Sequence, residues 1–386
     1  MKILFYLARY PAYGGIERVT TVLANYFTTV YNWKISILSS EQEDESNLLN
    51  LLDSSVGFYR LPFPEKIIDS RNKSYFDCLL KELSVNTIIF QDSYALVESL
   101  LYRIPQNIKL ITVEHNTPDC YLKTYNYGWK NVQSKTLFEF LKKILYPYFY
   151  IRIFKEIRQR HRKLYQLSDR YILLSENFIP VFQQISGLKH INKLNVIGNP
   201  LTIPILKNEY TTKEKICLFV GRLTEQKGID LLMNIWEKVE ESGSDWKLVI
   251  VGDGNKCEFM KQYILKSRLR QIQWVGNQSN VTPYYQKAKI LCMTSIFEGW
   301  GLVLVEAMAH GCIPVAFDSF LSISTIINAG RDGYLIPPFE KNKYRDKLLS
   351  LMNNPILCNK IAGNALQKSK SFCMNEIAIQ WKDIII

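Results

Sequence analysis

The chain has 386 residues, of which 47% are hydrophobic and 22% are charged, and its formal net charge is +12. This length predicts two domains, and the apolar fraction is sufficient for a large buried core. No apolar run reaches the ~20 residues that cross a bilayer, and the N-terminus lacks the apolar length and cleavage site of a signal peptide, so we expect a cytoplasmic protein. The eight cysteines have no C-x-x-C spacing, which favours buried, reduced thiols over a zinc site.

The first half of the chain has the pattern of a doubly wound α/β domain. A strand is predicted over residues 2–8, followed by a loop with Gly14 and Gly15 and by a helix with a one-sided apolar stripe. Compact apolar runs, typical of strands that are buried on both faces of a parallel sheet, recur at residues 34–39, 86–91, 109–115 and 170–175. Their alternation with helical segments favours the α/β class.

Between Tyr121 and Tyr165 the chain is strongly basic, with eleven Lys and Arg against two Glu. Apolar residues recur in this segment at helical spacing, and Pro147 is expected to break or kink the helix. Basic amphipathic helices bind anionic membrane surfaces, at ~1 kcal/mol per cation near the surface. Two ordinary domain helices with solvated basic faces are the alternative. We find no nucleic-acid-binding motif, so a nucleic acid is not expected as a partner.

A polar junction near residues 196–215 precedes a second α/β pattern. Strands are predicted at residues 215–221, 246–254, 272–278, 289–295 and 313–318, with a helix over 228–242. We therefore expect two Rossmann-like doubly wound domains, with their parallel sheets facing across a cleft. The predicted boundaries are 1–198 for the first domain, with the basic segment 121–165 in it, and 199–372 for the second. Residues 373–386 are expected to form a terminal helix that packs back on the first domain.

Residues 297–318, FEGWGLVLVEAMAHGCIPVAFD, place Glu298 and Glu306 eight positions apart around a glycine turn. The pattern predicts a strand before the turn and a helix after it, at the carboxyl edge of a parallel sheet, where open α/β folds bind ligands. Backbone N–H groups near Gly301 and Leu302 would lie at a helix N-terminus, which attracts phosphate. One carboxylate can reach a sugar at the mouth of such a site while the other accepts hydrogen bonds from ribose hydroxyls, each worth ~1.5–3 kcal/mol.

A second motif, GRLTEQKG at residues 221–228, follows a predicted buried strand directly. Arg222 and Lys227 lie five positions apart on a loop that leads into a helix, so the two cations could neutralise a diphosphate. Taken alone, the motif is equally compatible with a solvated loop that carries incidental charges.

Four motifs in order give the chain a resemblance to the retaining glycosyltransferases of family 4, which have the GT-B fold. They are PAYGGIERV near the N-terminus, the GR-x-x-x-Q-K-G loop, the VGDG turn after a strand, and the E-x7-E stretch. The resemblance covers essentially the whole chain. It implies a site for a nucleoside diphosphate sugar, and the residues that it assigns to substrate are Gly14, Gly15, Arg222, Lys227, Gly252, Asp253, Gly254, Glu298, Gly299, Trp300, Gly301, Leu302 and Glu306.

The resemblance also implies individual roles. Arg222 and Lys227 would hold the diphosphate and stabilise the charge of the leaving group, and Glu306 would bind the ribose. Glu298 and His115 would face the donor sugar. The expected catalytic residues are therefore Arg222, Lys227, Glu298 and His115, and Glu306 is expected only to bind substrate. In the same reading Gly14 and Gly15 approach the phosphate, residues 252–254 lie near the base, and Trp300 shapes the sugar pocket.

The implied reaction moves a hexose or N-acetylhexosamine to a hydroxyl with retention at the anomeric carbon. UDP is the expected nucleotide by its frequency in the family, and the expected acceptor is a lipid-linked saccharide of capsule, lipopolysaccharide or a related surface glycan, reached by peripheral association with the inner face of the membrane. The sequence has no D-x-D pair, which argues against the metal-dependent GT-A class, so no metal or other cofactor is expected.

Two other function classes stay open at this point. One is a nucleotide-sugar epimerase with the GT-B fold, which has no need of an E-x7-E stretch beside a basic amphipathic segment. The other is a non-enzymatic basic membrane-binding protein, which would leave the charged residues of the two motifs unexplained. A dinucleotide-dependent dehydrogenase is disfavoured because PAYGGIER does not have the G-x-G-x-x-G spacing.

Overall fold

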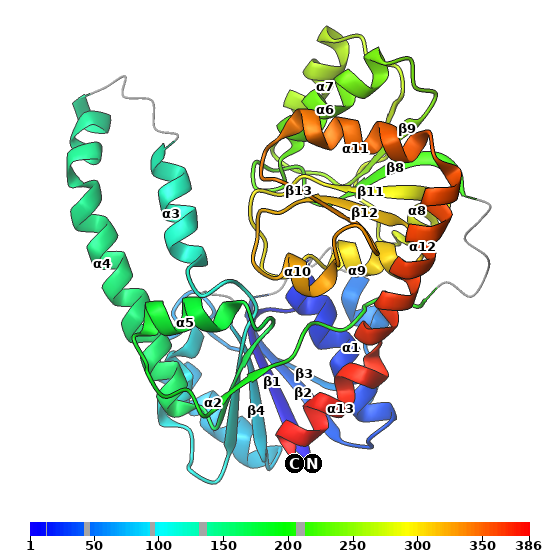
Figure 1. The fold of residues 1–386 in the computed structure, drawn as a ribbon. Coiled ribbons are helices and arrows are strands. Elements are labelled where there is room, and N and C mark those ends of the chain that lie inside the picture. The colour runs from blue at the N-terminus through cyan, green and yellow to red at the C-terminus, as the bar shows by residue number, and fades with distance from the viewer. Residues whose placement is uncertain (13, 42–46, 93–96, 131–136, 206–212) are drawn as a thin grey trace. The chain divides into compact units, whose positions relative to one another are not determined.

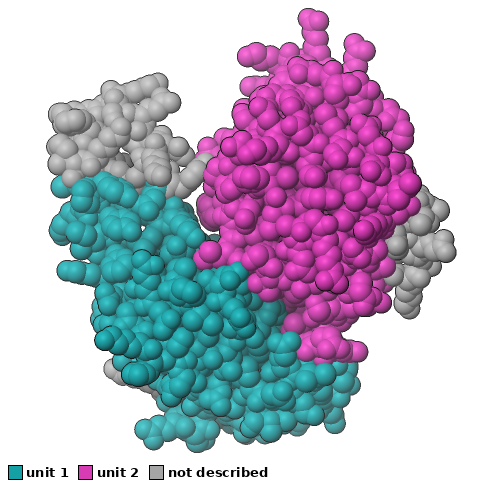
Figure 2. Space-filling view, viewed as in Figure 1, with its two compact units in different colours: residues 1–198, 378–386 teal, residues 199–377 magenta. Residues whose placement is uncertain are grey.

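The computed structural model of the chain describes residues 1–12, 14–41, 47–92, 97–130, 137–205 and 213–386 (Figure 1). It divides into two compact units, which Figure 2 shows in different colours. Unit 1 comprises residues 1–198 and 378–386, and unit 2 comprises residues 199–377. Each unit is built on a parallel sheet with helices between its strands. The expected fold class, two doubly wound α/β units of the GT-B type, is confirmed.

Unit 1 contains a seven-stranded sheet in the order β3-β2-β1-β4-β5-β6-β7. Its strands are β1 (Lys2–Arg9), β2 (Lys34–Glu41), β3 (Gly57–Arg60), β4 (Thr87–Asp92), β5 (Lys109–Glu114), β6 (Arg170–Leu173) and β7 (Leu194–Val196). The connections contain α1 (Gly15–Thr29), η1 (Asn47–Leu51), α2 (Ser70–Glu82), η2 (Val97–Arg103), α3 (Cys120–Lys130), α4 (Leu137–Leu167) and α5 (Phe178–Ser186). The edge strands β3 and β7 were not predicted, because they are short and only partly buried.

The central strand β1 shows why the sequence pattern is a continuous apolar run and not an alternation. Successive side chains of a strand point to opposite faces. On one face Phe5 stacks on Phe27 of α1, with ring centroids 6.3 Å apart. Tyr6, the next residue, packs on Phe76 of α2 at 5.8 Å. Both faces of β1 are thus covered by helices, so every position is apolar.

The last helix, α13 (Met374–Ile385), begins in unit 2, and its residues from Ala378 onward belong to unit 1. Trp381 packs on Phe27 of α1, with ring centroids 6.3 Å apart. Lys109 donates from Nζ to the carbonyl oxygen of Ile385 at 3.1 Å. The chain therefore ends against the sheet with which it starts.

Helix α4 is one continuous helix of 31 residues that runs through Pro147. Of the predicted break or kink at this proline, the break is wrong, and a kink is compatible with a continuous helix. A proline inside a helix removes one backbone hydrogen bond, and aromatic packing holds the adjacent turn in place. Tyr146, the residue before the proline, stacks on Tyr125 of α3 at 5.7 Å and contacts Tyr150 one turn later at 5.9 Å.

Figure 1 shows α3 and α4 running side by side and extending away from the sheet of unit 1. Part of the predicted basic segment 121–165, residues 131–136 and the side chains of 127–144, lies outside the described residues. In the part that the structure describes, α4 packs its inner face, with Ile153, Phe154 and Ile157, on α3 and α5. No described helix combines the length and hydrophobicity of a membrane span.

Unit 2 contains a six-stranded sheet in the order β10-β9-β8-β11-β12-β13. Its strands are β8 (Glu214–Val220), β9 (Lys247–Val251), β10 (Ile272–Trp274), β11 (Ala288–Met293), β12 (Ile313–Phe317) and β13 (Tyr334–Ile336). Its helices are α6 (Ile229–Glu241), α7 (Cys257–Lys266), α8 (Thr282–Lys287), α9 (Leu302–Ala309), α10 (Ile323–Ile326), α11 (Lys341–Met352) and α12 (Pro355–Ser369), followed by η4 (Lys370–Phe372). The apolar stripe of α6, including the fully buried Trp236, packs into the core beneath this sheet.

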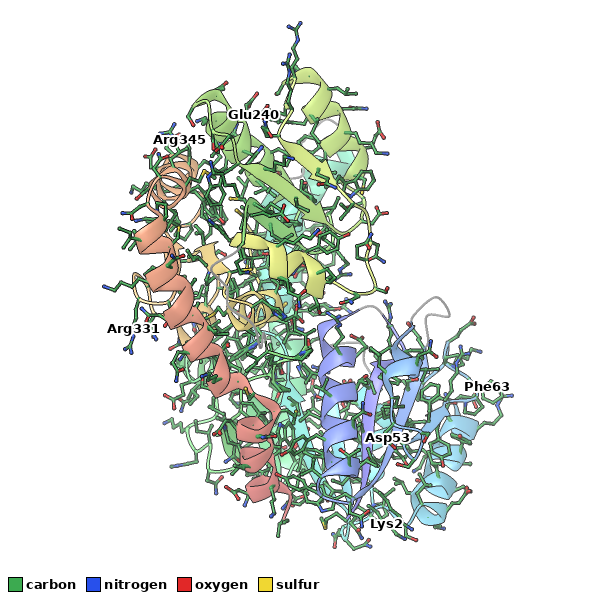
Figure 3. The ribbon with its side chains drawn as sticks, turned by 90° about the vertical axis from the view of Figure 1, so that its right-hand side faces the viewer. Lys2, Asp53, Phe63, Glu240, Arg331 and Arg345 are labelled. Atoms are coloured by element: carbon green, nitrogen blue, oxygen red, sulfur yellow. The ribbon has the colours of Figure 1, made fainter. Side chains whose placement is uncertain are left out.

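Side-chain hydrogen bonds to backbone groups hold several connections at the periphery, and Figure 3 labels three of the residues involved. In unit 1, the backbone N–H of Asp53 donates to Asn25 Oδ1 at 2.8 Å, and that of Phe63 donates to Asn72 Oδ1 at 2.9 Å. In unit 2, Glu240 accepts from two backbone N–H groups of the turn before β10, at 2.6 and 3.1 Å. These bonds satisfy backbone groups where the sheets offer no partner.

Candidate active site

The strand order of unit 2 identifies one edge of the sheet as the place for a ligand. The chain passes from β8 to β9 and β10 on one side and then returns to β11 on the other side of β8. Ligands of open α/β sheets bind outside the carboxyl ends of the strands at such a reversal. The loops after β8 and β11, residues 221–228 and 294–301, start at this point. They contain the two charged motifs of the sequence.

These two loops are hydrogen-bonded to each other. The backbone carbonyl oxygen of Gln226 accepts from the backbone N–H of Ile296 at 2.8 Å. The side-chain Nε2 of Gln226 donates to the carbonyl oxygen of Phe297 at 3.1 Å. Thr294 donates from Oγ1 to the carbonyl oxygen of Lys227 at 3.0 Å. Gly228 has a φ of +65°, and a Cβ there would lie 2.1 Å from the carbonyl oxygen of Thr294, so only glycine permits this close approach.

Within this pair of loops, Lys227 and Glu298 form an ion pair between Nζ and Oε1. Ser295 donates from Oγ to the same carboxylate oxygen at 2.7 Å. The two charged side chains are only 19% and 10% exposed, so water screens the pair less than it screens a surface pair. Arg222, on the same loop as Lys227, is exposed, and the structure assigns its side chain no hydrogen bond or ion pair among the described residues. The loop therefore presents one paired cation and one exposed cation.

Glu306 lies on α9 with 1% of its surface exposed. Thr202 donates from Oγ1 to its Oε1 at 2.6 Å, and Tyr285 donates from its hydroxyl to Oε2 at 2.9 Å. An ionised carboxylate has about four acceptor positions on its two oxygens. Glu306 is therefore an oriented, buried acceptor.

A second layer of polar groups supports Tyr285. The buried Lys213 donates from Nζ to the carbonyl oxygens of Tyr285 and Ala288, at 2.6 and 2.7 Å, and burial lowers the pKa of this lysine. His310 stacks on the Tyr285 ring and donates from Nδ1 to the carbonyl oxygen of Glu306 at 2.9 Å. Burial lowers the pKa of His310 as well. Thr202, Tyr285 and Lys213 were not predicted as site residues, because their contacts join distant parts of the chain, such as Thr202 and Glu306, which are 104 positions apart.

The VGDG turn after β9 packs directly against the loop after β8. Leu223 donates its backbone N–H to the carbonyl oxygen of Asp253 at 2.8 Å. A Cβ at Gly252 would lie 2.0 Å from the carbonyl oxygen of Gly221, and one at Gly254 would lie 2.4 Å from that of Leu223. The two glycines are thus required by backbone contact between the loops. Asp253 itself is exposed, and a hydrogen bond from the Cys257 thiol lowers its pKa.

The turn before α9 holds the other residues of the E-x7-E stretch. Gly301 is the N-cap of α9 with a φ of +93°, a conformation that favours glycine, and Leu302 is the first residue of the helix. Gly299 accepts at its carbonyl oxygen from Ser322 Oγ at 2.8 Å. The ring of Trp300 is only 4% exposed and packs edge-on against Phe372 at 6.0 Å. The ring that we expected to shape a sugar pocket therefore contributes mainly to the interior of unit 2.

Three predicted site residues lie in unit 1. Gly14 is the N-cap of α1 and Gly15 is its first residue, and the strand order of this sheet reverses between β1 and β4. His115 follows β5 and is buried, and its Nε2 is hydrogen-bonded to Gln91 Oε1 on the neighbouring strand β4. Both features are at the carboxyl edge of the sheet, the edge at which α/β folds place ligands.

The chain is similar in sequence to known glycosyltransferases. Residues 205–368 match the family described as Glycosyl transferases group 1. An uncharacterized glycosyltransferase of Haemophilus influenzae is 26% identical over 393 aligned residues, covering 100% of this chain and 99% of the relative. A Campylobacter jejuni relative, 23% identical over 100% of this chain and 98% of its own length, is named as the alpha-1,4-N-acetyl-D-galactosaminyltransferase of a PP-undecaprenol-linked saccharide.

The fold has a solved counterpart over its whole length. The crystal structure of Staphylococcus aureus TarM in complex with UDP and other ligands superposes with a TM-score of 0.77, at 15% identity, and covers 100% of this chain and 99% of that one. This similarity supports the GT-B fold independently of the family match. The motif loops 221–228 and 294–301 fall inside the region that matches the group 1 glycosyltransferase family.

Proposed function

We propose that this protein is a retaining glycosyltransferase that moves a hexose or N-acetylhexosamine from a nucleoside diphosphate sugar to a hydroxyl of a lipid-linked saccharide in surface polysaccharide synthesis. The observation that carries the proposal is the ion pair of Lys227 with Glu298 at the strand-order reversal of unit 2. Two motifs supply these two charges from positions 71 residues apart, at the edge where open α/β sheets bind ligands.

In this proposal, the donor lies on the carboxyl edge of the unit 2 sheet. Glu306 accepts hydrogen bonds from the ribose hydroxyls, and its burial and two internal donors hold it in one orientation. Arg222, Lys227 and the N-terminus of α9 face the diphosphate, and the loop of residues 252–254 lies toward the base. Uridine is the proposed base, supported by the UDP in the TarM structure.

Chemically, the bond from the anomeric carbon to the diphosphate oxygen breaks, and a bond to the acceptor oxygen forms on the same face of the sugar. The proton of the acceptor hydroxyl passes to the leaving phosphate. Lys227 exchanges its contact with Glu298 for the leaving phosphate and so stabilises the charge that develops there. Glu298 and His115 are proposed to contact the donor sugar, and Glu298 is already oriented by Ser295.

This arrangement uses fixed protein cations where other glycosyltransferases use a metal ion, so we propose that turnover needs no divalent cation. After dialysis against EDTA, the rate of donor consumption is expected to stay within about twofold of the untreated rate, since fixed donors supply the stabilisation. Loss of activity that a single added metal restores would contradict this prediction.

A lipid-linked acceptor requires the protein to work at a membrane surface, and the outer face of α4 is the proposed contact. We define this outer face by Leu145, Tyr148, Ile151, Arg152 and Lys155, all exposed and successively one or three positions apart. Apolar and basic groups on one helical stripe suit the boundary between headgroups and acyl chains of an anionic leaflet. The undecaprenol-linked saccharide in the name of the Campylobacter relative supports this acceptor class.

Membrane contact can be tested by sedimentation with phosphatidylglycerol vesicles at low salt. Replacement of both Arg152 and Lys155 by Glu is expected to lower the vesicle partition coefficient by at least about tenfold, because each cation contributes ~1 kcal/mol near the surface. The matched control reverses Lys34 and Lys81, which are exposed on other elements of unit 1, and is expected to bind like the wild type. Equal binding of both double variants would contradict a role for the outer face of α4.

The reaction class is tested by donor turnover with and without an acceptor. Release of nucleoside diphosphate that depends on a polyprenyl-diphosphate-linked saccharide supports the transferase, and retention is read from the anomeric configuration of the product by NMR. Conversion of the nucleotide sugar without an acceptor would indicate an epimerase. If no nucleotide binds to the folded protein, a non-enzymatic membrane-binding protein becomes the better interpretation.

A further inference from the structure

Three consecutive residues near the end of α4 each contact a different segment of unit 1. Arg160 forms a buried ion pair with Glu98 of η2, with Nε 3.1 Å from Oε1 and Nη2 3.3 Å from Oε2. Arg162 donates from Nε to the carbonyl oxygen of Ser186 in α5 at 2.6 Å. His161, between them, is fully buried and contacts Pro118 in the loop after β5. The end of α4 is therefore attached to the connections that follow β4, β5 and β6.

The histidine joins a buried cluster with Glu114 and Tyr171, both 0% exposed. His161 Nε2 lies 3.0 Å from the carbonyl oxygen of Pro118, and since a carbonyl only accepts, Nε2 carries a proton and donates. Its Nδ1 lies 3.2 Å from the Tyr171 hydroxyl and 3.4 Å from Glu114 Oε2. The Tyr171 hydroxyl in turn donates to Glu114 Oε2 at 2.9 Å. The side chains of Glu114, Tyr171 and His161 and the carbonyl group of Pro118 thus form one buried cluster of polar contacts.

The two ends of this cluster lie on either side of His115. Glu114 is the last residue of β5 and immediately precedes it, and Pro118 follows three positions later. The ring of His115 is held separately by Gln91 on β4. Both the backbone around His115 and its imidazole are therefore restrained, and α4 supplies one of the restraints.

We propose that His161, together with Tyr171, is a positioning residue that fixes the loop of His115 through this buried cluster. The proposal rests on the proposed function, in which His115 contacts the donor sugar. A catalytic group that shifts by 1 Å can cost about 100-fold in rate, so a buried cluster that prevents such a shift has a direct effect on turnover. Because His161 lies on α4, the same cluster ties the His115 loop to the helix that bears the proposed membrane contact.

The first test compares two buried tyrosines. Tyr171→Phe removes the central hydroxyl of the cluster and keeps the ring, and kcat is expected to fall about tenfold while the KM for the donor stays within about twofold. Tyr165→Phe is the matched control, since its ring lies 5.9 Å from that of Tyr171 and its hydroxyl accepts from the backbone N–H of Lys193, away from the His115 loop. The control is expected to keep the wild-type kcat.

The second test uses the conservative replacement of the histidine. His161→Leu removes both ring nitrogens and is expected to lower kcat by about 100-fold. His161→Gln keeps an N–H donor at a similar reach toward the carbonyl oxygen of Pro118, and it is expected to recover about tenfold of that loss. If the leucine variant does not fold, the comparison of Tyr171→Phe with Tyr165→Phe still decides.

Hydrogen–deuterium exchange of the full-length protein measures the loop directly and needs no activity. Amides of residues 115–119 are expected to exchange at least about tenfold faster in Tyr171→Phe than in Tyr165→Phe, since they lose a restraint on local opening. Equal exchange and equal kcat in the two variants would overturn the proposal. Faster exchange in Tyr171→Phe than in Tyr165→Phe, combined with no transferase activity of the wild type, would refute the proposed function and with it the catalytic role of the cluster.

Discussion

Glu306→Ala is expected to remove most of the stabilisation that a nucleoside diphosphate confers on this protein. The carboxylate is proposed to accept two ribose hydroxyls, and hydrogen bonds to a charged group contribute ~1.5–3 kcal/mol each. Loss of about 3 kcal/mol weakens binding by about 100-fold. At a ligand concentration of 100 Kd, stabilisation of the wild type is about 2.7 kcal/mol, and in the variant it falls to about 0.4 kcal/mol.

The measurement is a thermal-shift panel of UDP, GDP, ADP and CMP with their common sugar conjugates. Thr202→Val is the matched control, because it removes the 2.6 Å hydrogen bond to the same carboxylate and leaves the carboxylate in place. It is expected to lower the melting temperature of the free protein and to keep most of the nucleotide shift. A nucleotide shift in Glu306→Ala equal to that of the wild type would exclude this residue as the ribose acceptor.

Lys227→Met is expected to lower kcat by about 10²–10³-fold, with a smaller effect on the donor KM. Removing one preformed donor to a developing negative charge has this magnitude in other enzymes, and methionine retains the length of the apolar stem. In the structure Lys227 is paired with Glu298. The variant therefore also leaves a carboxylate with only 10% of its surface exposed without its cation, and we expect some loss of thermal stability.

Lys256→Met is the control variant, because it removes a cation that is not among the proposed catalytic residues. Lys256 belongs to the same unit and pairs with Glu225 at 3.2 Å, in a more exposed ion pair of the neighbouring loop. Steady-state kinetics of both variants with one donor and one acceptor provide the comparison. Similar kcat values for the two variants, or a pure increase in KM for Lys227→Met, would argue that Lys227 binds the ground state and does not stabilise the leaving group.

Much of the fold follows from local patterns along the chain. The buried strands of both sheets are continuous apolar runs, and these were predicted at the correct places because a parallel strand covered on both faces has no polar positions. The helix after Gly301 was also predicted correctly. The short strands β3, β7 and β13 were missed, since three or four residues at a sheet edge have no period of their own. The break expected at Pro147 does not occur, because packing on α3 outweighs a local preference.

The candidate site likewise has features that the sequence predicts and features that only the tertiary structure shows. The types of residue it needs, a cation in one motif and two glutamates in another, are readable as spacing in the sequence. Their partners are set by strand order, which brings together residues that are far apart in the chain. Three sets of contacts therefore arise only when β-strands become neighbours and helices cover them. They are the ion pair of Lys227 with Glu298, the hydrogen bonds from Thr202 and Tyr285 to Glu306, and the cluster around His161. A local pattern records what a residue is, whereas its hydrogen-bond partner depends on packing between distant segments.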